Sequence, residues 1–192
     1  YPDGTASEFA NCYDPTWGRH RSRTRPTPGN HDYETPGASV YFNYFGAAAG
    51  PAGLGSYSYD VGNWHIVSIN TNVNIPAQVA WLQQDLDVHR IRCTVAYWHQ
   101  PLYTSGPHGP APAVRDLWRV LYRNNAEVVL GGDAHFYERF APQDHEGQFD
   151  PVRGLRQFVV GTGGAPLHSV RETMPFSERI IRQFGVLKLT LE

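Results

Sequence analysis

The chain has 192 residues, of which 41% are hydrophobic and 13% aromatic, which is enough to bury the core of one domain but short for two. Its 16 Lys and Arg and 18 Asp and Glu give a net charge of -2, which argues against a nucleic-acid partner because nucleic-acid-binding domains usually carry a basic excess. No apolar run approaches the roughly 20 residues of a membrane-spanning helix, so we expect no membrane partner. We therefore expect residues 1–192 to form a single domain.

The first part of the chain predicts a short helix, a basic segment and a long loop. Residues 6–13 are compatible with a short helix. Residues 19–25 alternate arginine with other residues, and we interpret this run as a solvated surface segment in preference to one that steers phosphate. Residues 37–55 are rich in Gly and Ala, which predicts a loop.

From residue 56 onward, strands and helices alternate. Gly62 and Asn63 are typical turn residues between flanks rich in Tyr, Val and Ile, which predicts a hairpin over residues 56–70. Apolar stripes predict two helices, at residues 76–88 and 113–124. Short apolar runs and a final leucine alternation are typical of strands: residues 93–98, 126–130, 158–160 and 187–191. This order indicates an α/β fold, whose ligand sites gather beyond the ends of strands.

Two cysteines, Cys12 and Cys93, leave two possibilities open. They can form one disulfide in an oxidising compartment, or they can be two buried thiols.

The chain begins at Tyr1 without a Met, which we interpret as the start of a processed or truncated product.

Three short clusters carry nitrogen and oxygen donors at predicted strand ends: Gly29-Asn30-His31-Asp32, Trp98-His99-Gln100-Pro101 and Gly132-Asp133-Ala134-His135. Imidazole, carboxylate and amide oxygen suit Zn²⁺, Fe and Mn²⁺ as ligands. No cysteine lies near them, which argues against a cysteine-based zinc site. Each cluster alone is explained by a turn or a hydrogen-bonded structural histidine, but all three in this order favour a metal site.

Hydrolysis of a phosphoester would use such a set. Two metal ions about 3.5–4 Å apart neutralise the phosphate, generate a hydroxide and clamp the reacting oxygens. A histidine that binds no metal is also needed, to stabilise charge or to protonate the leaving oxygen. Asp32, directly after His31, is placed to orient and charge that imidazole.

The three clusters, together with Tyr137-Glu138-Arg139 after the last one, resemble the calcineurin-like metallophosphoesterase superfamily. Within it they are most similar to the purple acid phosphatases and their secreted bacterial relatives, and the resemblance covers almost the whole chain. It implies a four-layer αββα sandwich of two mixed sheets with the metals at its crest. It also implies a secreted or periplasmic protein.

The resemblance implies a role for each candidate residue. Asn30, His99 and Asp133 would bind the second metal, and His135 and Tyr1 the first. His31, supported by Asp32, would contact the phosphate, and His108 would be the general acid, with an exposed loop residue as the alternative reading of His108. The family usually has His where Asp133 stands, and a carboxylate there favours Fe or Mn over Zn. The implied cofactors are two metal ions, Fe with Zn or Mn.

The family also has two earlier motifs, Asp-x-His or Asp-x-Gly on its first strand and Gly-Asp-x-x-Tyr on its second. Tyr1 looks like the tyrosine that closes the second of these, so we expect an N-terminally truncated chain that lacks the first strands and several metal ligands. The remaining histidines are interpreted as structural or solvated: His65 within a strand, and His20, His89, His145 and His168 in polar or turn settings.

The favoured function is hydrolysis of a small phosphate monoester by a metal-bound hydroxide. Three other hypotheses stay open. A phosphodiesterase on the same scaffold is favoured by Asp133. A remnant without catalytic activity is favoured by the missing ligands. A structural protein with a single zinc ion is the third. The leaving group and the oligomeric state are not predicted.

Overall fold

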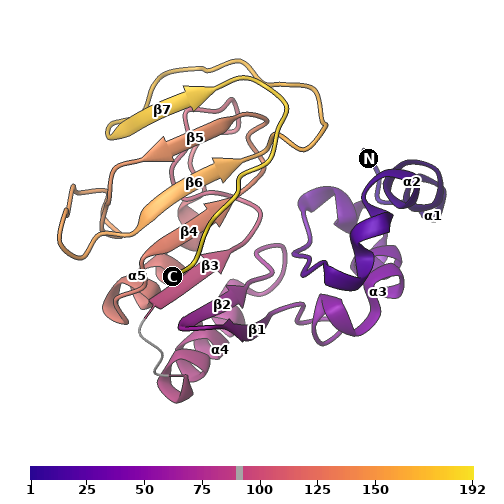
Figure 1. Ribbon diagram of the computed structural model, residues 1–192, viewed down its shortest axis with the longest axis horizontal. Coiled ribbons are helices and arrows are strands. Elements are labelled where there is room, and N and C mark those ends of the chain that lie inside the picture. The colour runs from indigo at the N-terminus through magenta and orange to yellow at the C-terminus, as the bar shows by residue number, and fades with distance from the viewer. Residues whose placement is uncertain (90–92) are drawn as a thin grey trace.

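The computed structural model describes residues 1–89 and 93–192. A helical N-terminal part lies to one side of an α/β part that is built on a single sheet (Figure 1). The two parts have separate hydrophobic clusters, one centred on Phe9, Tyr41 and Phe45, the other on the sheet and its helices.

The N-terminal part consists of short helical segments. A capping box begins the first one: the Thr5 hydroxyl accepts from the Glu8 amide, and the Glu8 carboxylate accepts from the Thr5 amide. The α-helices are α1 (Ala6–Glu8), α2 (Asp14–Thr16) and α3 (Ser39–Phe45). Tighter or wider turns complete this part: η1 (Phe9–Tyr13), η2 (Gly18–Arg23), η3 (Asn30–Glu34), η4 (Pro36–Ala38) and η5 (Gly46–Ala49).

The prediction of a loop over residues 37–55 is wrong for its first half. Residues 39–45 form α3, whose Tyr41 and Phe45 are buried in one hydrophobic cluster with Phe9. The Gly and Ala residues that flank α3 obscured its aromatic stripe. Burial of aromatic side chains, which each remove a large apolar area from water, explains why this segment is helical despite its flanks.

Seven strands form one mixed sheet in the order β1-β2-β3-β4-β6-β5-β7. β2, β3, β4 and β6 run parallel, whereas β1, β5 and β7 are antiparallel to their neighbours. The strands are β1 (Tyr57–Val61), β2 (Trp64–Ser68), β3 (Cys93–Tyr97), β4 (Val128–Gly131), β5 (Tyr137–Phe140), β6 (Arg156–Val160) and β7 (Ser177–Ile181). The predicted hairpin and the three predicted inner strands are confirmed.

Two helices pack against each other and share the core of the sheet: α4 (Ile75–Val88) and α5 (Arg115–Arg123), the latter preceded by the turn η6 (Pro112–Val114). The Asn74 side chain caps α4 by accepting from the Ala77 amide. Leu82 and Leu86 of α4 are buried, as are four residues of α5: Leu117, Trp118, Val120 and Leu121. Both predicted helices are confirmed.

The expected sandwich of two sheets is not what the described residues form, since all their named strands belong to one sheet. β5 and β7, which no sequence pattern predicted, add to the β6 edge instead of starting a second sheet. Residues 182–192 form no strand despite the leucine alternation. They run extended alongside the sheet (Figure 1), where Leu189 and Leu191 line a cavity with Ile66, Val95 and Leu130.

The structure also bears on the two cysteines and on the expected absence of a membrane-spanning helix. Cys12 is exposed, Cys93 is half-buried, and they form no disulfide. Over the described residues, no helix combines the length and the apolar character that crossing a membrane requires.

Candidate functional site

The ends of β3 and β4 bring the second and third motifs together. Beyond the last residue of β3, the Trp98 amide still donates to the Leu130 carbonyl (3.1 Å). The Gly132 amide then donates to the His99 carbonyl (2.8 Å). Because this ladder continues past the strand end, Asp133 lies beside His99 at the carboxyl edge of the parallel strands.

Donor atoms from all three motifs meet at one imidazole nitrogen. His99 Nε2 lies 2.7 Å from Asn30 Oδ1 and 3.4 Å from Asp133 Oδ1. Burial alone raises the pKa of the Asp133 carboxyl, but the hydrogen bond from His99 and the nearby His108 and His135 outweigh it and hold that pKa below its usual range. Asp133 has a φ of 60°, a left-handed conformation that non-glycine residues rarely adopt and that clusters at functional sites.

Glycines allow the close approach of these loops. A Cβ on Gly29 would lie 3.0 Å from His99 Cε1. A Cβ on Gly161 would lie 2.0 Å from the Ala134 carbonyl oxygen, between Asp133 and His135. The glycine turn after β6 therefore presses directly on the third motif, and only a residue without a side chain leaves room for it.

The first motif is held against the strand ends by polar side chains. Thr27 Oγ1 donates to the Ile69 carbonyl (3.0 Å), and Asn72 Nδ2 donates to the Pro28 carbonyl (2.9 Å). Gln100 Nε2 donates to Asn72 Oδ1 (3.1 Å). The second motif thus supports the backbone that carries Asn30.

His31 and Asp32 have separate partners. Asp32 is buried and accepts from the Tyr1 hydroxyl (2.6 Å) and the Gly29 amide (2.8 Å), whereas exposed His31 bonds the Pro2 carbonyl. The two side chains therefore do not bond each other, and the Tyr1 hydroxyl is engaged by Asp32. Burial raises the pKa of the Asp32 carboxyl, although these two hydrogen bonds oppose the rise.

His135 stacks on His168, a histidine whose sequence setting predicts a solvated side chain. The rings of His135 and His168 are 3.8 Å apart and nearly parallel, and the His135 amide donates to His168 Nδ1 (3.1 Å). His135 Nδ1 bonds the Pro166 carbonyl (2.8 Å). Because a carbonyl only accepts, His135 Nδ1 carries the proton and His135 Nε2 is left as a ligand atom, the arrangement typical of metal-binding histidines.

His168 and His108 extend this stack. Their rings are 5.2 Å apart, and His108 Nδ1 lies 3.7 Å from Asp133 Oδ2. Burial, followed by the neighbouring His135 and His108, lowers the pKa of His168. One feature of the sequence could have placed His168 in the site. It follows, by four residues, the glycine turn at residues 161–164, which contacts the third motif.

The loop that carries His108 is anchored by a buried carboxylate. Glu138 accepts from the Ser105 amide (2.8 Å), the Ser105 hydroxyl and the Ser177 hydroxyl (2.7 Å). The Ser105 carbonyl accepts from the Arg171 amide (3.0 Å). Glu138 therefore holds this loop in place.

The donors suit the metal ions that the resemblance implies. Asn30, His99 and Asp133 supply an amide oxygen, an imidazole nitrogen and a carboxylate oxygen around one point, a set that suits Fe, Mn and Zn. His135 supplies Nε2, because its other ring nitrogen, Nδ1, is held by the Pro166 carbonyl. A second ion would need further oxygen ligands in addition to His135, because the Tyr1 hydroxyl is bonded to Asp32.

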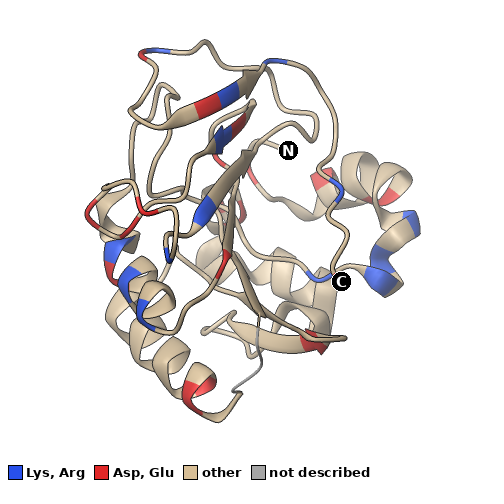
Figure 2. Ribbon diagram, turned by 60° about the vertical axis from the view of Figure 1, so that its left-hand side comes forward, with Lys and Arg blue, Asp and Glu red and all other residues tan. Residues whose placement is uncertain are grey.

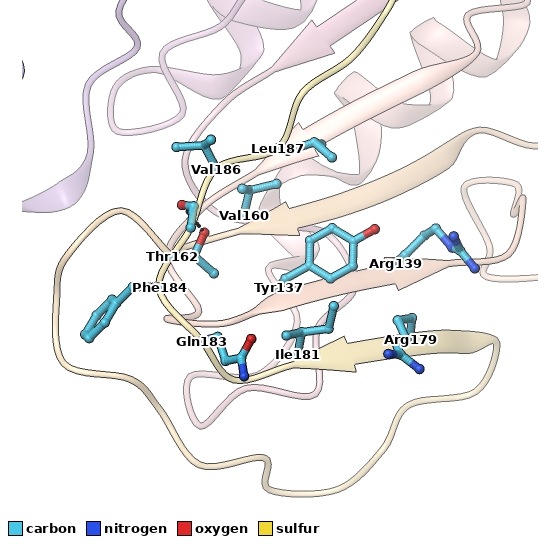
Figure 3. A pocket seen from close by; sticks show the side chains of 11 residues that line it. Tyr137, Arg139, Val160, Thr162, Arg179, Ile181, Gln183, Phe184, Val186 and Leu187 are labelled. Atoms are coloured by element: carbon cyan, nitrogen blue, oxygen red, sulfur yellow. Dashed lines mark hydrogen bonds between the residues drawn. The ribbon is translucent and has the colours of Figure 1, made fainter.

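A cavity of about 560 Å³ lies elsewhere, over β5, β6 and β7 and beside the C-terminal segment (Figure 3). Its lining includes Tyr137, Arg139 and Arg179, but none of the metal-type donors of the three motifs.

The arginines of the basic segment at residues 19–25 are exposed, and Arg21 lies over the Tyr44 ring (4.5 Å). Figure 2 shows acidic and basic residues spread over both parts of the molecule.

Comparisons with known proteins agree on one family. The calcineurin-like phosphoesterase profile matches residues 3–137. Purple acid phosphatase 21 of Arabidopsis thaliana is 30% identical over 92% of this chain and 47% of that protein. Probable inactive purple acid phosphatase 9 of the same plant is 36% identical over 44% of this chain and 15% of that protein.

A solved structure is similar in fold over most of this chain. The purple acid phosphatase PPD1 from yellow lupin (Lupinus luteus) superposes with a TM-score of 0.69 at 22% identity, over 82% of this chain and 32% of that one. The chain therefore spans less than half the length of these relatives.

Proposed function

The chain belongs to the calcineurin-like phosphoesterase family, and we propose that it carries the metal-binding and substrate-binding part of a phosphatase that hydrolyses small phosphate monoesters. One observation carries the proposal: Asn30, His99 and Asp133, from three motifs far apart in the chain, meet at a single imidazole nitrogen. The similarity to purple acid phosphatases supports the choice of a monoester.

In this proposal Asn30, His99 and Asp133 hold one ion, and His135 contributes to a second. Two such ions, when bound, neutralise the phosphate and make water a stronger nucleophile. The family resemblance implies Fe with Zn or Mn, and the carboxylate of Asp133 favours Fe or Mn over Zn, since hard oxygen ligands suit Fe and Mn.

The chain's own histidines bind the substrate and move a proton. His31 is exposed, so its ring can turn from the Pro2 carbonyl to a phosphoryl oxygen. His108, with 56% of its side chain exposed, lies at the site entrance, where it gives a proton to the leaving oxygen. Asp32 acts indirectly: it ties Tyr1 to the Gly29 amide and so holds the loop that carries His31.

Hydrolysis of p-nitrophenyl phosphate in the presence of Fe, Mn or Zn tests this function. We expect His99→Ala and His135→Ala each to lower kcat by at least about 100-fold, since ligand loss removes the ion's contribution. His20→Ala is the control, because His20 belongs to none of the three motifs and its ring nitrogens face Arg19 and Arg23. Full activity in the His99→Ala/His135→Ala double variant would refute the proposal.

A phosphodiesterase is the second candidate, favoured by Asp133. The ratio of rates on p-nitrophenyl phosphate and bis(p-nitrophenyl) phosphate decides between the two. We expect the monoester to be preferred and Asp133→His to increase that preference. A preference for the bis-ester that Asp133→His reverses would support the diesterase.

A remnant without catalytic activity is the third candidate. The name of the Arabidopsis relative that is called inactive, and a donor set that completes one ion more readily than two, both favour it. Retained metal binding at His99 without turnover of either ester would support it.

A secreted or periplasmic location is a further proposal, and fractionation of the source cells tests it.

A further inference from the structure

A second cluster of metal-type ligands lies at the opposite end of the parallel strands from the three motifs. His65 is in β2 and is paired in register with Thr94, near the start of β3, whereas His99 follows the end of β3. Asp85 is in the last turn of α4, and His89 follows the final residue of that helix. Neither the three motifs nor the proposed function uses any of these side chains.

The cluster is compact. His65 Nε2 lies 2.7 Å from Asp85 Oδ2, and His89 Nδ1 lies 3.3 Å from Asp85 Oδ1. His89 Nδ1 also bonds the Asp85 carbonyl (2.9 Å), a hydrogen bond that metal binding at this nitrogen would break. One ligand atom from each of the three residues lies within 4.8 Å of the others. His65 and Asp85 are buried, whereas 41% of the His89 side chain is exposed, which gives an ion a path to the cluster from solvent.

Neighbouring side chains orient the ligands. Asp60 is the cross-strand partner of His65, and Asp60 Oδ1 lies 2.7 Å from His65 Nδ1. Ser58 Oγ donates to Asp85 Oδ1 (2.7 Å). A carboxylate on the far ring nitrogen is typical of metal-binding histidines, because it selects the tautomer that turns the other nitrogen towards the ion.

We propose that His65, Asp85 and His89 form a second, structural metal site that binds Zn²⁺. Two imidazoles and one carboxylate are a ligand set that zinc accepts, with water in the remaining position. The ion ties the β1–β2 hairpin to the end of α4 and has no part in phosphate chemistry. The competing explanation is that a proton alone is shared between His65 and the carboxylates of Asp60 and Asp85.

Zinc titration of the full chain separates these explanations. The His99→Ala/His135→Ala double variant removes donors of the motif site, so that zinc bound to it reports on this cluster. After chelator treatment and its removal, we expect calorimetry to detect one zinc per chain. Adding His89→Ala to this background should weaken binding by more than the roughly 100-fold that loss of a supporting partner costs. His20→Ala in the same background should leave binding unchanged.

Two further variants keep the test decisive if His89→Ala alters the end of α4. His89→Gln keeps a similar volume, and Asp60→Asn removes the carboxylate behind His65, for which we expect a roughly 10–100-fold loss of zinc affinity. Titration with Co²⁺ adds a spectroscopic readout, since its visible bands report bound imidazole. Zinc affinity and stoichiometry that are the same in the background, His89→Ala and Asp60→Asn proteins would overturn the proposal and leave the shared proton as the explanation.

Discussion

The two histidine clusters use the same kinds of side chain at opposite ends of the parallel strands, but their surroundings differ. At the amino end, His65 is fully buried between two carboxylates supplied by β1 and α4. At the carboxyl end, the donors lie in loops, Asp133 has a left-handed backbone, and more than half of His108 is exposed. Strands and a helix position the amino-end cluster, whereas close backbone contacts between loops position the carboxyl-end cluster. We therefore expect changes in the amino-end cluster to affect mainly the stability of the protein, and changes in the carboxyl-end cluster to affect mainly its activity.

The largest effect should come from breaking the amino-end cluster. His65→Ala removes the imidazole that pairs with buried Asp85, and we expect it to lower the free energy of unfolding by about 3 kcal/mol. This is the lower end for a broken buried pair, because Asp60 is half exposed and Asp85 keeps the Ser58 hydroxyl as a donor. Urea denaturation of the metal-free protein measures it. His99→Ala is the matched variant at the carboxyl end, with an expected loss within about 1 kcal/mol. Equal losses in both variants would contradict the division between stability and activity.

The next effect should come from the glycine that presses on the third motif. Gly161→Ala places a methyl group against the Ala134 carbonyl, so we expect a loss of about 2 kcal/mol from overpacking and a fall in ester hydrolysis. Gly163→Ala is the control, since no atom beyond its two chain neighbours lies within 4 Å of its added carbon. A Gly161→Ala protein with the stability and activity of the control would show that this contact does not shape the site.

A smaller effect is expected from the histidine stack. His168→Ala removes the ring on His135 and the acceptor of the His135 amide, which should cost about 1 kcal/mol of stability and lower kcat several-fold. His168→Phe keeps the stack and loses the acceptor, so it separates the two contributions. Unfolding curves and steady-state kinetics measure both, and unchanged kcat in His168→Ala would remove this residue from the site.

The smallest expected change in the free energy of unfolding concerns Glu178, which lies outside both clusters and provides a reference for them. A hydrogen bond from Arg156 holds the pKa of the Glu178 carboxyl below its usual value against the opposing effect of desolvation, and the charge of Arg156 and a hydrogen bond from Arg139 add to the lowering. A lowered folded-state pKa contributes stability above the unfolded pKa of about 4.3, and that stability is lost as pH falls through the lower folded value. Because these side chains are about one-third exposed, Glu178→Gln should cost less than about 1 kcal/mol at pH 7. The difference should shrink as the pH falls below the unfolded pKa, and a difference that stays constant on acidification would contradict this explanation.

The sequence predicted what local patterns determine. The hairpin followed from Gly62 and Asn63 between strand-forming flanks, and α4 and α5 followed from their apolar stripes. β7 and the irregular C-terminal segment depend on pairing with β5 and packing against the sheet, which no local pattern encodes. Leucine alternation alone therefore gave the wrong element at residues 187–191.

The candidate site shows the same limit. The motifs predicted which donors belong to it, and the structure brings Asn30, His99 and Asp133 together, although their roles as metal ligands remain a prediction. The partners of these residues were not predictable. His168 joins the site through a long connection, and the contact between Gly161 and Ala134 depends on β6 lying beside β4.

The pairing of Asp60 with His65 also has a consequence for the order of folding. These two residues are five positions apart, and Asp85 is 20 positions from His65, whereas the Asn30–His99 contact spans 69 positions. Hairpins close within about 1–10 μs, and contacts between distant segments form more slowly because a longer loop must be ordered first. The amino-end cluster is therefore expected to assemble early, so that the chain builds its anchor before the loops that would carry out the chemistry meet.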